Sequence, residues 1–264
     1  MIKKCIKKCL SIPMLATAKW RRLPEFLIIG AQKSGTTSLF HYLTEHQTVL
    51  KNPLRHKEIY FFNKKYEKGI QYYRHYFPLK WSRGEVGEAT TTYLHDDHTA
   101  LRVHAHIPDV KLIVILRDPC ERAISHYYHQ VVRGRETRSL EEAFSASILH
   151  RYEAGIQKDG WSYGYLFNGD YGRHLEEWLK YFDRAQLYVG KAENMFSEPQ
   201  LEFDRICDFL EIERQQMDCF SVQNQGGKKA HDPEVVLRLR EFYQPKVMHL
   251  KSLGLEDLDW EYYE

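Results

Sequence analysis

Short apolar runs alternate with amphipathic segments along most of the chain. Phe26–Ile29 and Lys111–Leu116 (KLIVIL) are almost wholly apolar and rich in β-branched residues, which is typical of strands covered on both faces. The spacing of apolar positions predicts three helices and one more strand: helices over Thr36–His46, Tyr171–Phe182 and Leu201–Leu210, and a strand over Gln186–Val189. Strands that alternate with helices predict an α/β fold with a mainly parallel central sheet flanked by helices.

Two Asp-Pro pairs mark the starts of further predicted helices. Asp118 followed by Pro119 is typical of a helix start, with the aspartate as N-cap and the proline in the first helical position. A second strand–turn–helix unit is therefore expected after Leu116. Asp232-Pro233 opens a late helix in the same way, and we expect Pro245 to bend or end it.

The chain length bounds the domain organisation. A chain of 264 residues is near the upper limit for a single hydrophobic core. We interpret residues 1–23 as a basic N-terminal tail and residues 24–264 as one domain. Residues 133–168 are rich in glycine, tyrosine and charge and lack a strong period, so we interpret them as an insertion or cap.

The charge balance and the cysteines indicate which partners and which cellular compartment to expect. The chain has 38 Lys+Arg against 36 Asp+Glu, a net charge of +2, which argues against a nucleic-acid partner. An anionic ligand must then be met by a few well-placed cations. The five cysteines are scattered without a CxxC pair, which favours a reducing compartment and a cytoplasmic location.

The first fifteen residues have an amphipathic pattern. One helical face would carry apolar or cysteine side chains and the other would carry lysines: Met1, Ile2, Cys5, Ile6, Cys9 and Leu10 against Lys3, Lys4, Lys7 and Lys8. Two interpretations stay open: a frayed basic tail, or a helix that makes peripheral contact with an anionic membrane surface. No stretch of the sequence approaches the roughly 18–20 apolar residues of a membrane-spanning helix.

The most informative segment is Gly30–Ser38 (GAQKSGTTS), between a predicted strand and a predicted helix. Small residues there let backbone N–H groups approach an anion, and the helix N-terminus attracts negative charge. The loop is not a Walker A sequence, because Thr36 stands where that motif has its lysine and Lys33 comes earlier. A magnesium-dependent nucleotide triphosphatase or kinase is thereby disfavoured but kept as an alternative.

Two motifs resemble those of the PAPS-dependent sulfotransferases (PAPS, 3′-phosphoadenosine 5′-phosphosulfate). Lys33–Thr37 (KSGTT) matches the 5′-phosphosulfate loop K-x-G-T-[ST], and Arg117 with Ser125 eight residues later matches the 3′-phosphate site. The resemblance implies a P-loop-like three-layer fold, PAPS as co-substrate, release of PAP and no metal. It implies donor-binding roles for these residues: Lys33, Ser34, Gly35, Thr36, Thr37, Ser38, Arg117 and Ser125.

The chain is most similar to the heparan sulfate (glycosaminoglycan) sulfotransferase branch. Lys57–Phe62 (KEIYFF) resembles the K-E-x-x-F-F segment of that branch, which implies that Glu58 is the catalytic base. Gly226–His231 (GGKKAH) resembles a late loop that closes over the nucleotide. This adds five donor-binding residues by resemblance: Gly227, Lys228, Lys229, Ala230 and His231. The resemblance covers roughly residues 24–260.

Departures from the branch leave the acceptor open. Where those enzymes have E-K-T-P-x-Y, this chain reads Glu88–Tyr93 (EATTTY), so Ala89 replaces a lysine. The late loop also lacks their cysteine pair. A carbohydrate or glycolipid hydroxyl is the expected acceptor, and a small-molecule or lipid hydroxyl is the alternative.

The expected reaction assigns a task to two side chains. PAPS carries about four negative charges, and Lys33, Arg117, Lys228 and Lys229 supply four positive ones. We expect Lys33 to stabilise the leaving bridging oxygen. Glu58 is the expected general base, and His95 is the alternative because small-molecule sulfotransferases use a histidine. Glu58 could instead form an ordinary surface ion pair with Lys57.

Aromatic residues are dense between Phe61 and Trp81. These side chains either stack on the sugar rings of an acceptor or pack a helix against the sheet. Both interpretations stay open at the level of sequence.

Overall fold

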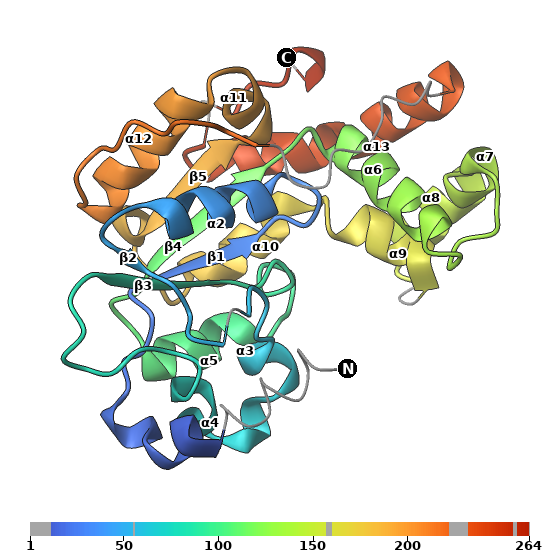
Figure 1. Ribbon diagram of the computed structural model, residues 1–264. Coiled ribbons are helices and arrows are strands. Elements are labelled where there is room, and N and C mark those ends of the chain that lie inside the picture. The colour runs from blue at the N-terminus through green and yellow to red at the C-terminus, as the bar shows by residue number, and fades with distance from the viewer. Residues whose placement is uncertain (1–11, 55, 157–159, 222–231, 256–257, 264) are drawn as a thin grey trace.

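A five-stranded parallel sheet forms the centre of the molecule (Figure 1). The computed structural model describes residues 12–54, 56–156, 160–221, 232–255 and 258–263. The strand order is β2-β3-β1-β4-β5. The strands are β1 Phe26–Gly30, β2 Val49–Leu50, β3 Glu85–Ala89, β4 Lys111–Leu116 and β5 Leu187–Lys191. The predicted mainly parallel α/β sheet is confirmed.

Helices connect and cover the strands. The α-helices are α2 Thr36–Glu45, α3 Phe61–Lys64, α4 Ile70–Arg74, α5 Thr99–His106, α6 Pro119–Val132, α7 Leu140–Ala143, α8 Ala146–Glu153, α9 Gly160–Phe167, α10 Tyr171–Leu179, α11 Ala192–Ser197, α12 Pro199–Leu210 and α13 Pro233–Ser252. Four short 3-10 helices complete the described elements: η1 Ala18–Trp20, η2 Tyr66–Lys68, η3 Arg184–Gln186 and η4 Glu261–Tyr263.

Side-chain alternation along the central strands produces the three layers. Phe26 and Ile28 of β1 pack with α2 and α12, whereas Leu27 and Ile29 pack with the opposite layer, which includes α10 and α13. The same alternation divides β4, because Ile113 contacts the first layer and neighbouring strand positions contact the second. Both faces of these strands are therefore apolar, as the sequence pattern indicated.

Most element boundaries follow their local sequence signals. The side chain of Asp118 accepts a hydrogen bond of 2.9 Å from the backbone N–H of Glu121, and Pro119 begins α6. α13 also begins after its expected cap, Asp232, but it continues through Pro245 to Ser252. Of the two expected effects of Pro245, an end of the helix is therefore excluded, and a bend stays a prediction. Buried residues on both sides of the proline, such as Tyr243 and Val247, hold the two halves against the core.

The aromatic cluster between Phe61 and Trp81 is mainly a packing unit. Phe61, Phe62, Tyr73 and Phe77 are fully buried, and the rings of Phe61 and Tyr73 stack with centroids 4.7 Å apart. The structure thus supports packing over sugar stacking for these four side chains. Trp81 differs because 70% of it is exposed.

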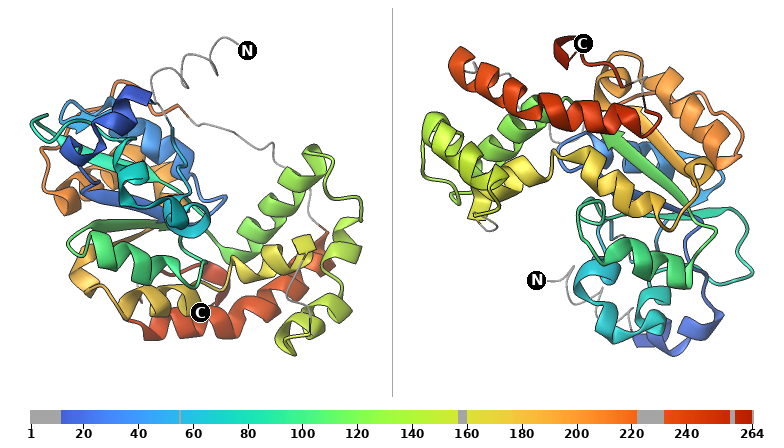
Figure 2. Two further views of the ribbon diagram at one scale, coloured as in Figure 1. Left: turned by 90° about the horizontal axis from the view of Figure 1, so that it is seen from below. Right: turned by 180° about the vertical axis from the view of Figure 1, so that it is seen from behind.

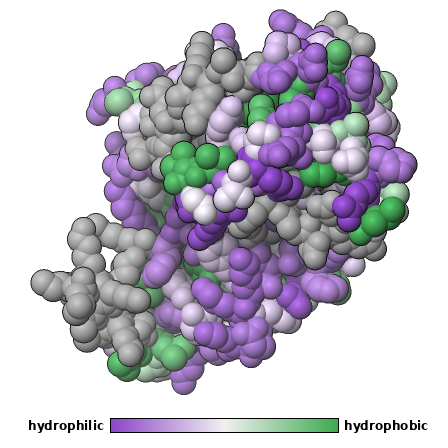
Figure 3. Space-filling model, turned by 90° about the vertical axis from the view of Figure 1, so that its right-hand side faces the viewer, coloured by the Kyte–Doolittle hydropathy of each residue, from purple (hydrophilic) through white to green (hydrophobic). Residues whose placement is uncertain are grey.

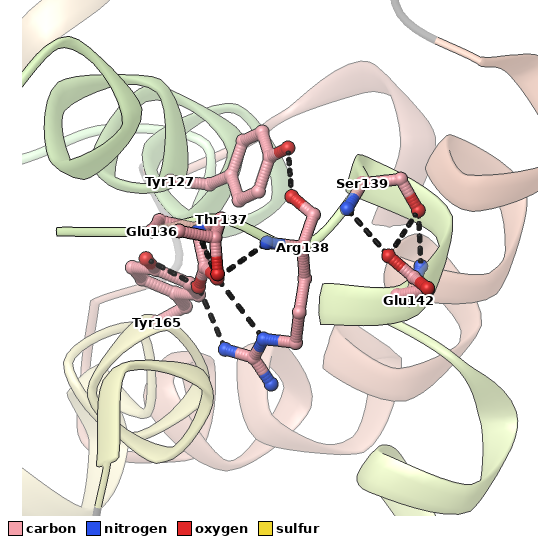
Figure 4. Close-up of polar contacts among 7 residues, drawn as sticks. All are labelled: Tyr127, Glu136, Thr137, Arg138, Ser139, Glu142 and Tyr165. Carbon is pink, nitrogen blue, oxygen red and sulfur yellow. Dashed lines mark hydrogen bonds and ion pairs between the residues drawn. The ribbon is translucent and has the colours of Figure 1, made fainter. Parts of the chain in front are cut away.

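The described parts of residues 133–168, namely 133–156 and 160–168, form a helical subregion beside α6 and α13, seen to one side of the sheet in Figures 1 and 2. Its buried carboxylate, Glu136, accepts hydrogen bonds from the backbone and guanidinium of Arg138 and from Tyr165 Oη at 3.0 Å (Figure 4). Tyr127 of α6 donates to the Arg138 carbonyl at 2.8 Å. These bonds fix the start of the subregion to α6 and α9.

The described surface is mainly polar where the subregion faces outward. In Figure 3, hydrophilic side chains cover most of the described part of that face, and hydrophobic ones form small separate groups. None of the described helices combines the length and apolar character needed to cross a membrane.

The predicted N-terminal tail lies partly outside the described residues. From residue 12 onward the chain contacts the domain, because Met14 and Ala18 are buried and Arg21 donates a 2.8 Å hydrogen bond to the Phe77 carbonyl. Residues 1–11, which carry the amphipathic pattern, are not described. The peripheral membrane contact stays a prediction.

Gly87 provides a test of the β1–β3 register. It pairs with Phe26, and a Cβ at residue 87 would overlap the ring of Phe26. We expect Gly87→Ala to lower the free energy of unfolding by about 1–3 kcal/mol because the buried ring must move. Urea denaturation measures this change.

Gly164→Ala is the matched control. Gly164 lies in α9, and a Cβ added there would have nothing within 4 Å outside its own helix backbone and chain neighbours. This substitution should leave the unfolding free energy unchanged or raise it by up to about 1 kcal/mol. Equal stability of the two variants would contradict the register.

Candidate active site

Three neighbouring strands end at the same edge of the sheet and carry the candidate residues. In the order β3-β1-β4, Ile28 pairs with Ala89 and Gly30 pairs with Val114. The loop after β1 contains Lys33 and the residue after β4 is Arg117. Ligands of open parallel sheets bind outside the carboxyl ends of the strands, so this edge is the expected place for a site.

The loop between β1 and α2 has the features of an anion cradle. Gly35 is the N-cap of α2 with φ of 80°, a left-handed conformation that favours glycine, and a Cβ there would displace the tip of the Met195 side chain. Gly35 has no side chain with which to cap the first turn of α2, and no capping hydrogen bond is found there among the described residues. Ser34 is fully buried, and its hydroxyl has no hydrogen-bond partner among the described residues. Uncapped N–H groups and an unpartnered buried hydroxyl fit a bound phosphate or sulfate.

Lys33 brings positive charge to this cradle. It has φ of 77°, and its pKa is lowered by burial and then by the positive charges of Arg117 and Arg133. The two predicted residues Lys33 and Arg117 therefore lie close enough for their positive charges to repel each other. Arg133, at the end of α6, was missed because an arginine after a helix has many ordinary structural explanations.

Arg117 and Ser125 occupy the predicted strand-to-helix corner. Tyr171 donates a 2.9 Å hydrogen bond to the Arg117 carbonyl, and the Arg117 guanidinium forms a 3.1 Å ion pair with Glu121. Both side chains of that pair are partly exposed, at 26% and 34%, so the guanidinium stays accessible to a ligand.

The spacing along α6 indicates where Ser125 points. Ser125, His129 and Arg133 follow one another at intervals of four residues and so share a helix face. The pKa of His129 is lowered to about 4 by burial, followed by the charges of Lys33, Arg133 and Arg135. The charge of Lys33 therefore reaches His129, which places this part of α6 within electrostatic range of the phosphate loop.

Glu58 lies next to the end of β3. Its carboxylate accepts a hydrogen bond from Tyr60 Oη and another, 3.1 Å long, from Thr91 Oγ1. The alternative of an ordinary ion pair with Lys57 is not supported. Lys57 Nζ instead donates a 2.7 Å hydrogen bond to Thr37 Oγ1 at the start of α2.

His95 occupies a different environment. Its ring lies near those of Phe167 and His174, with centroids 6.2 and 6.1 Å away. Burial, followed by the charges of His174 and Arg122, lowers the pKa of His95 to about 3. An imidazole with that pKa is neutral near pH 7 and accepts a proton only weakly.

Part of the predicted site cannot be located. Gly227, Lys228, Lys229, Ala230 and His231 lie outside the described residues. Within the described ranges, no three His, Cys, Asp or Glu side chains come together in a metal-binding group.

The proteins that this chain matches in sequence and in structure are sulfotransferases by name. Human heparan sulfate glucosamine 3-O-sulfotransferase 3B1 is 31% identical over 265 residues, which is 91% of this chain and 66% of that protein. Human bifunctional heparan sulfate N-deacetylase/N-sulfotransferase 3 is 33% identical over 72% of this chain, although the match spans only 22% of that longer protein. The crystal structure of a sulfotransferase from Alicyclobacillus acidocaldarius superposes with a TM-score of 0.72 at 29% identity, covering 88% of this chain and 96% of that one.

The sequence profile of the sulfotransferase domain matches residues 23–230, which include the phosphate loop, the Glu58 segment and the Arg117 corner. Family, fold and site thus agree, and the chain belongs to the sulfotransferase domain family.

Proposed function

We propose that this protein transfers a sulfuryl group from PAPS to an acceptor hydroxyl on a carbohydrate or glycolipid and releases PAP. The observation that carries the proposal is the pairing of two strand-to-helix corners. Lys33 and Arg117 come from different corners and lie within electrostatic range of each other, and Lys33 lies in the loop that leads into the N-terminus of α2. Glu58 approaches the same region from the end of β3.

The two corners suit the two charged ends of the donor. The cradle of Ser34, Gly35 and the first turn of α2 offers N–H and hydroxyl donors to the 5′-phosphosulfate. Arg117 and Ser125 are the proposed partners of the 3′-phosphate. Together with Lys33 they place fixed positive charge opposite a ligand with about four negative charges.

The residues also suit in-line sulfuryl transfer. The Glu58 carboxylate takes the proton of the acceptor hydroxyl, and that oxygen forms the new S–O bond. The bond between sulfur and the bridging oxygen breaks, and its electron pair stays on the 5′-phosphate of PAP. Lys33 and the loop amides stabilise the charge that grows on this leaving oxygen.

A carbohydrate acceptor is supported by the relatives. The two human proteins are, by name, enzymes of heparan sulfate, one a glucosamine 3-O-sulfotransferase and the other an N-sulfotransferase. Ala89 stands where the heparan sulfate sulfotransferase branch has a lysine, and it is fully buried. This chain therefore lacks the positive charge that those enzymes have at this position. Incubation with PAPS and panels of glycans, glycolipids, phenols and steroids tests the acceptor class. Release of PAP only with phenols or steroids would overturn the carbohydrate proposal.

Removing the Arg117 guanidinium should lower the affinity only for nucleotides that carry a 3′-phosphate. We expect Arg117→Met to lower affinity for PAP about 10- to 100-fold, the worth of a charge-assisted hydrogen bond. Affinity for adenosine 5′-phosphosulfate, which lacks the 3′-phosphate, should change less than threefold. Isothermal titration calorimetry measures both, without magnesium.

Arg214→Met is the matched control for this experiment. Arg214 is exposed and pairs with Asp208 on α12, outside the site, so both affinities should stay unchanged. Equal losses for the two nucleotides in Arg117→Met would refute the 3′-phosphate assignment. Magnesium-dependent binding of ATP by the unsubstituted chain would favour the kinase alternative instead.

Removing the carboxylate of Glu58 should stop the reaction but spare the donor site. We expect Glu58→Gln to reduce kcat by at least about 100-fold because the acceptor proton loses its base. PAP affinity should change less than threefold. Glu67→Gln, an exposed glutamate of the same segment, is the control and should keep full activity. Normal turnover in Glu58→Gln would exclude Glu58 as the base.

A further inference from the structure

Lys57 is a cation whose position the proposed donor and base roles leave unexplained. Its ammonium group donates a 2.7 Å hydrogen bond to Thr37 Oγ1, in the first turn of α2. An ammonium has three donors, and this neutral hydroxyl is its one hydrogen-bond acceptor within the described residues. No described carboxylate forms an ion pair with Lys57, although Glu58 is its neighbour in sequence.

This placement is electrostatically unfavourable in the ligand-free chain. The N-terminus of a helix carries partial positive charge, so a cation beside it is repelled. Lys57 is also half-buried, and burial lowers its pKa, opposed only by the charge of Glu58. Lys33 brings a second positive charge to the same loop. An anion bound at this helix N-terminus would lower the electrostatic cost of placing a cation there.

The backbone shows how Lys57 reaches the loop. The Lys57 carbonyl accepts a hydrogen bond of 3.3 Å from the N–H of Ala89, so residue 57 lies directly beside the end of β3. Ala89 itself is fully buried in the apolar layer that includes Leu39 of α2. The side chain at position 89 therefore cannot present charge here, whereas the irregular segment beside it delivers an ammonium to the start of α2.

We propose that Lys57 binds the non-bridging oxygens of the sulfuryl group during transfer and thus acts as a second catalytic lysine. This inference rests on the proposed function. In an in-line transfer, the attacking and leaving oxygens lie on opposite sides of sulfur and the other three oxygens lie between them. Lys57 adjoins Glu58, which serves the attacking oxygen, and contacts Thr37 of the loop that holds the leaving group. Its ammonium is therefore placed between the two ends of the reaction.

This role adds electrostatic stabilisation and no further proton transfer. The acceptor proton still goes to Glu58, and the electron pair of the broken S–O bond still stays on PAP. Lys57 remains protonated and opposes the negative charge that spreads over the sulfuryl oxygens as the bonds exchange. PAP lacks the sulfuryl group, so Lys57 should matter for turnover much more than for binding of PAP.

The decisive comparison is between Lys57→Met and Lys51→Met. Lys51 is an exposed lysine that pairs with Glu45, so the same substitution there removes a charge outside the site. We expect Lys57→Met to lower kcat with saturating PAPS at least about 100-fold, as removal of one transition-state donor does. The Kd for PAP, measured by calorimetry, should change less than tenfold. Lys51→Met should match the unsubstituted enzyme in both.

The outcomes separate this inference from the proposed function. If the unsubstituted chain neither binds PAP nor releases it from PAPS, the proposed function fails. If that chain is active and Lys57→Met keeps kcat within threefold, or loses PAP affinity as steeply as kcat, only the role of Lys57 is overturned. Lys57→Gln serves as a second variant with a polar side chain, and PAP binding by either variant confirms that it is folded.

Discussion

At the active-site edge of the sheet, the fold holds several lysine and arginine side chains close together, and among the described residues they outnumber the carboxylates that pair with them. Lys33 is repelled by Arg117 and Arg133, and Lys57 lies at the same helix N-terminus. Arg117 has Glu121 as a partner, but the two lysines have no ion pair among the described residues. A chain of net charge +2 can therefore bind a highly charged nucleotide, because local placement rather than overall composition creates the attraction. The layers of the fold serve to keep these cations in place.

Sequence patterns predicted the parts of this arrangement that have strong local causes. β4 is an almost uninterrupted apolar run, and α6 begins with an aspartate cap and a proline, so both ends of β4 and the start of α6 were predicted. The phosphate loop combines a left-handed glycine with small hydroxyl residues, which few other structures require. The family motifs then linked the two corners. Their closeness follows from the adjacency of β1 and β4 in one parallel sheet.

Other parts have no local signal. β3 reads Glu-Val-Gly-Glu-Ala, and its strand character comes from neighbours on both sides and from buried partners of Glu88 such as Tyr73. An ion pair between Lys57 and Glu58 stayed open as an alternative, because sequence spacing cannot show that Glu58 is hydrogen-bonded to Tyr60 and Thr91. Both cases depend largely on contacts between segments far apart in the sequence, which periodicity does not encode.

Three buried or partly buried histidines, His95, His129 and His174, add no positive charge near neutral pH. Burial and neighbouring positive charges lower the pKa of His129 and of His174 to about 4, and that of His95 to about 3. Each imidazole is thus neutral near pH 7 and gains a proton only in strongly acidic solution. The attraction for an anionic donor consequently comes from lysine and arginine. A histidine with so low a pKa is a poor base, and the proposed base is the carboxylate of Glu58, which accepts hydrogen bonds from Tyr60 and Thr91.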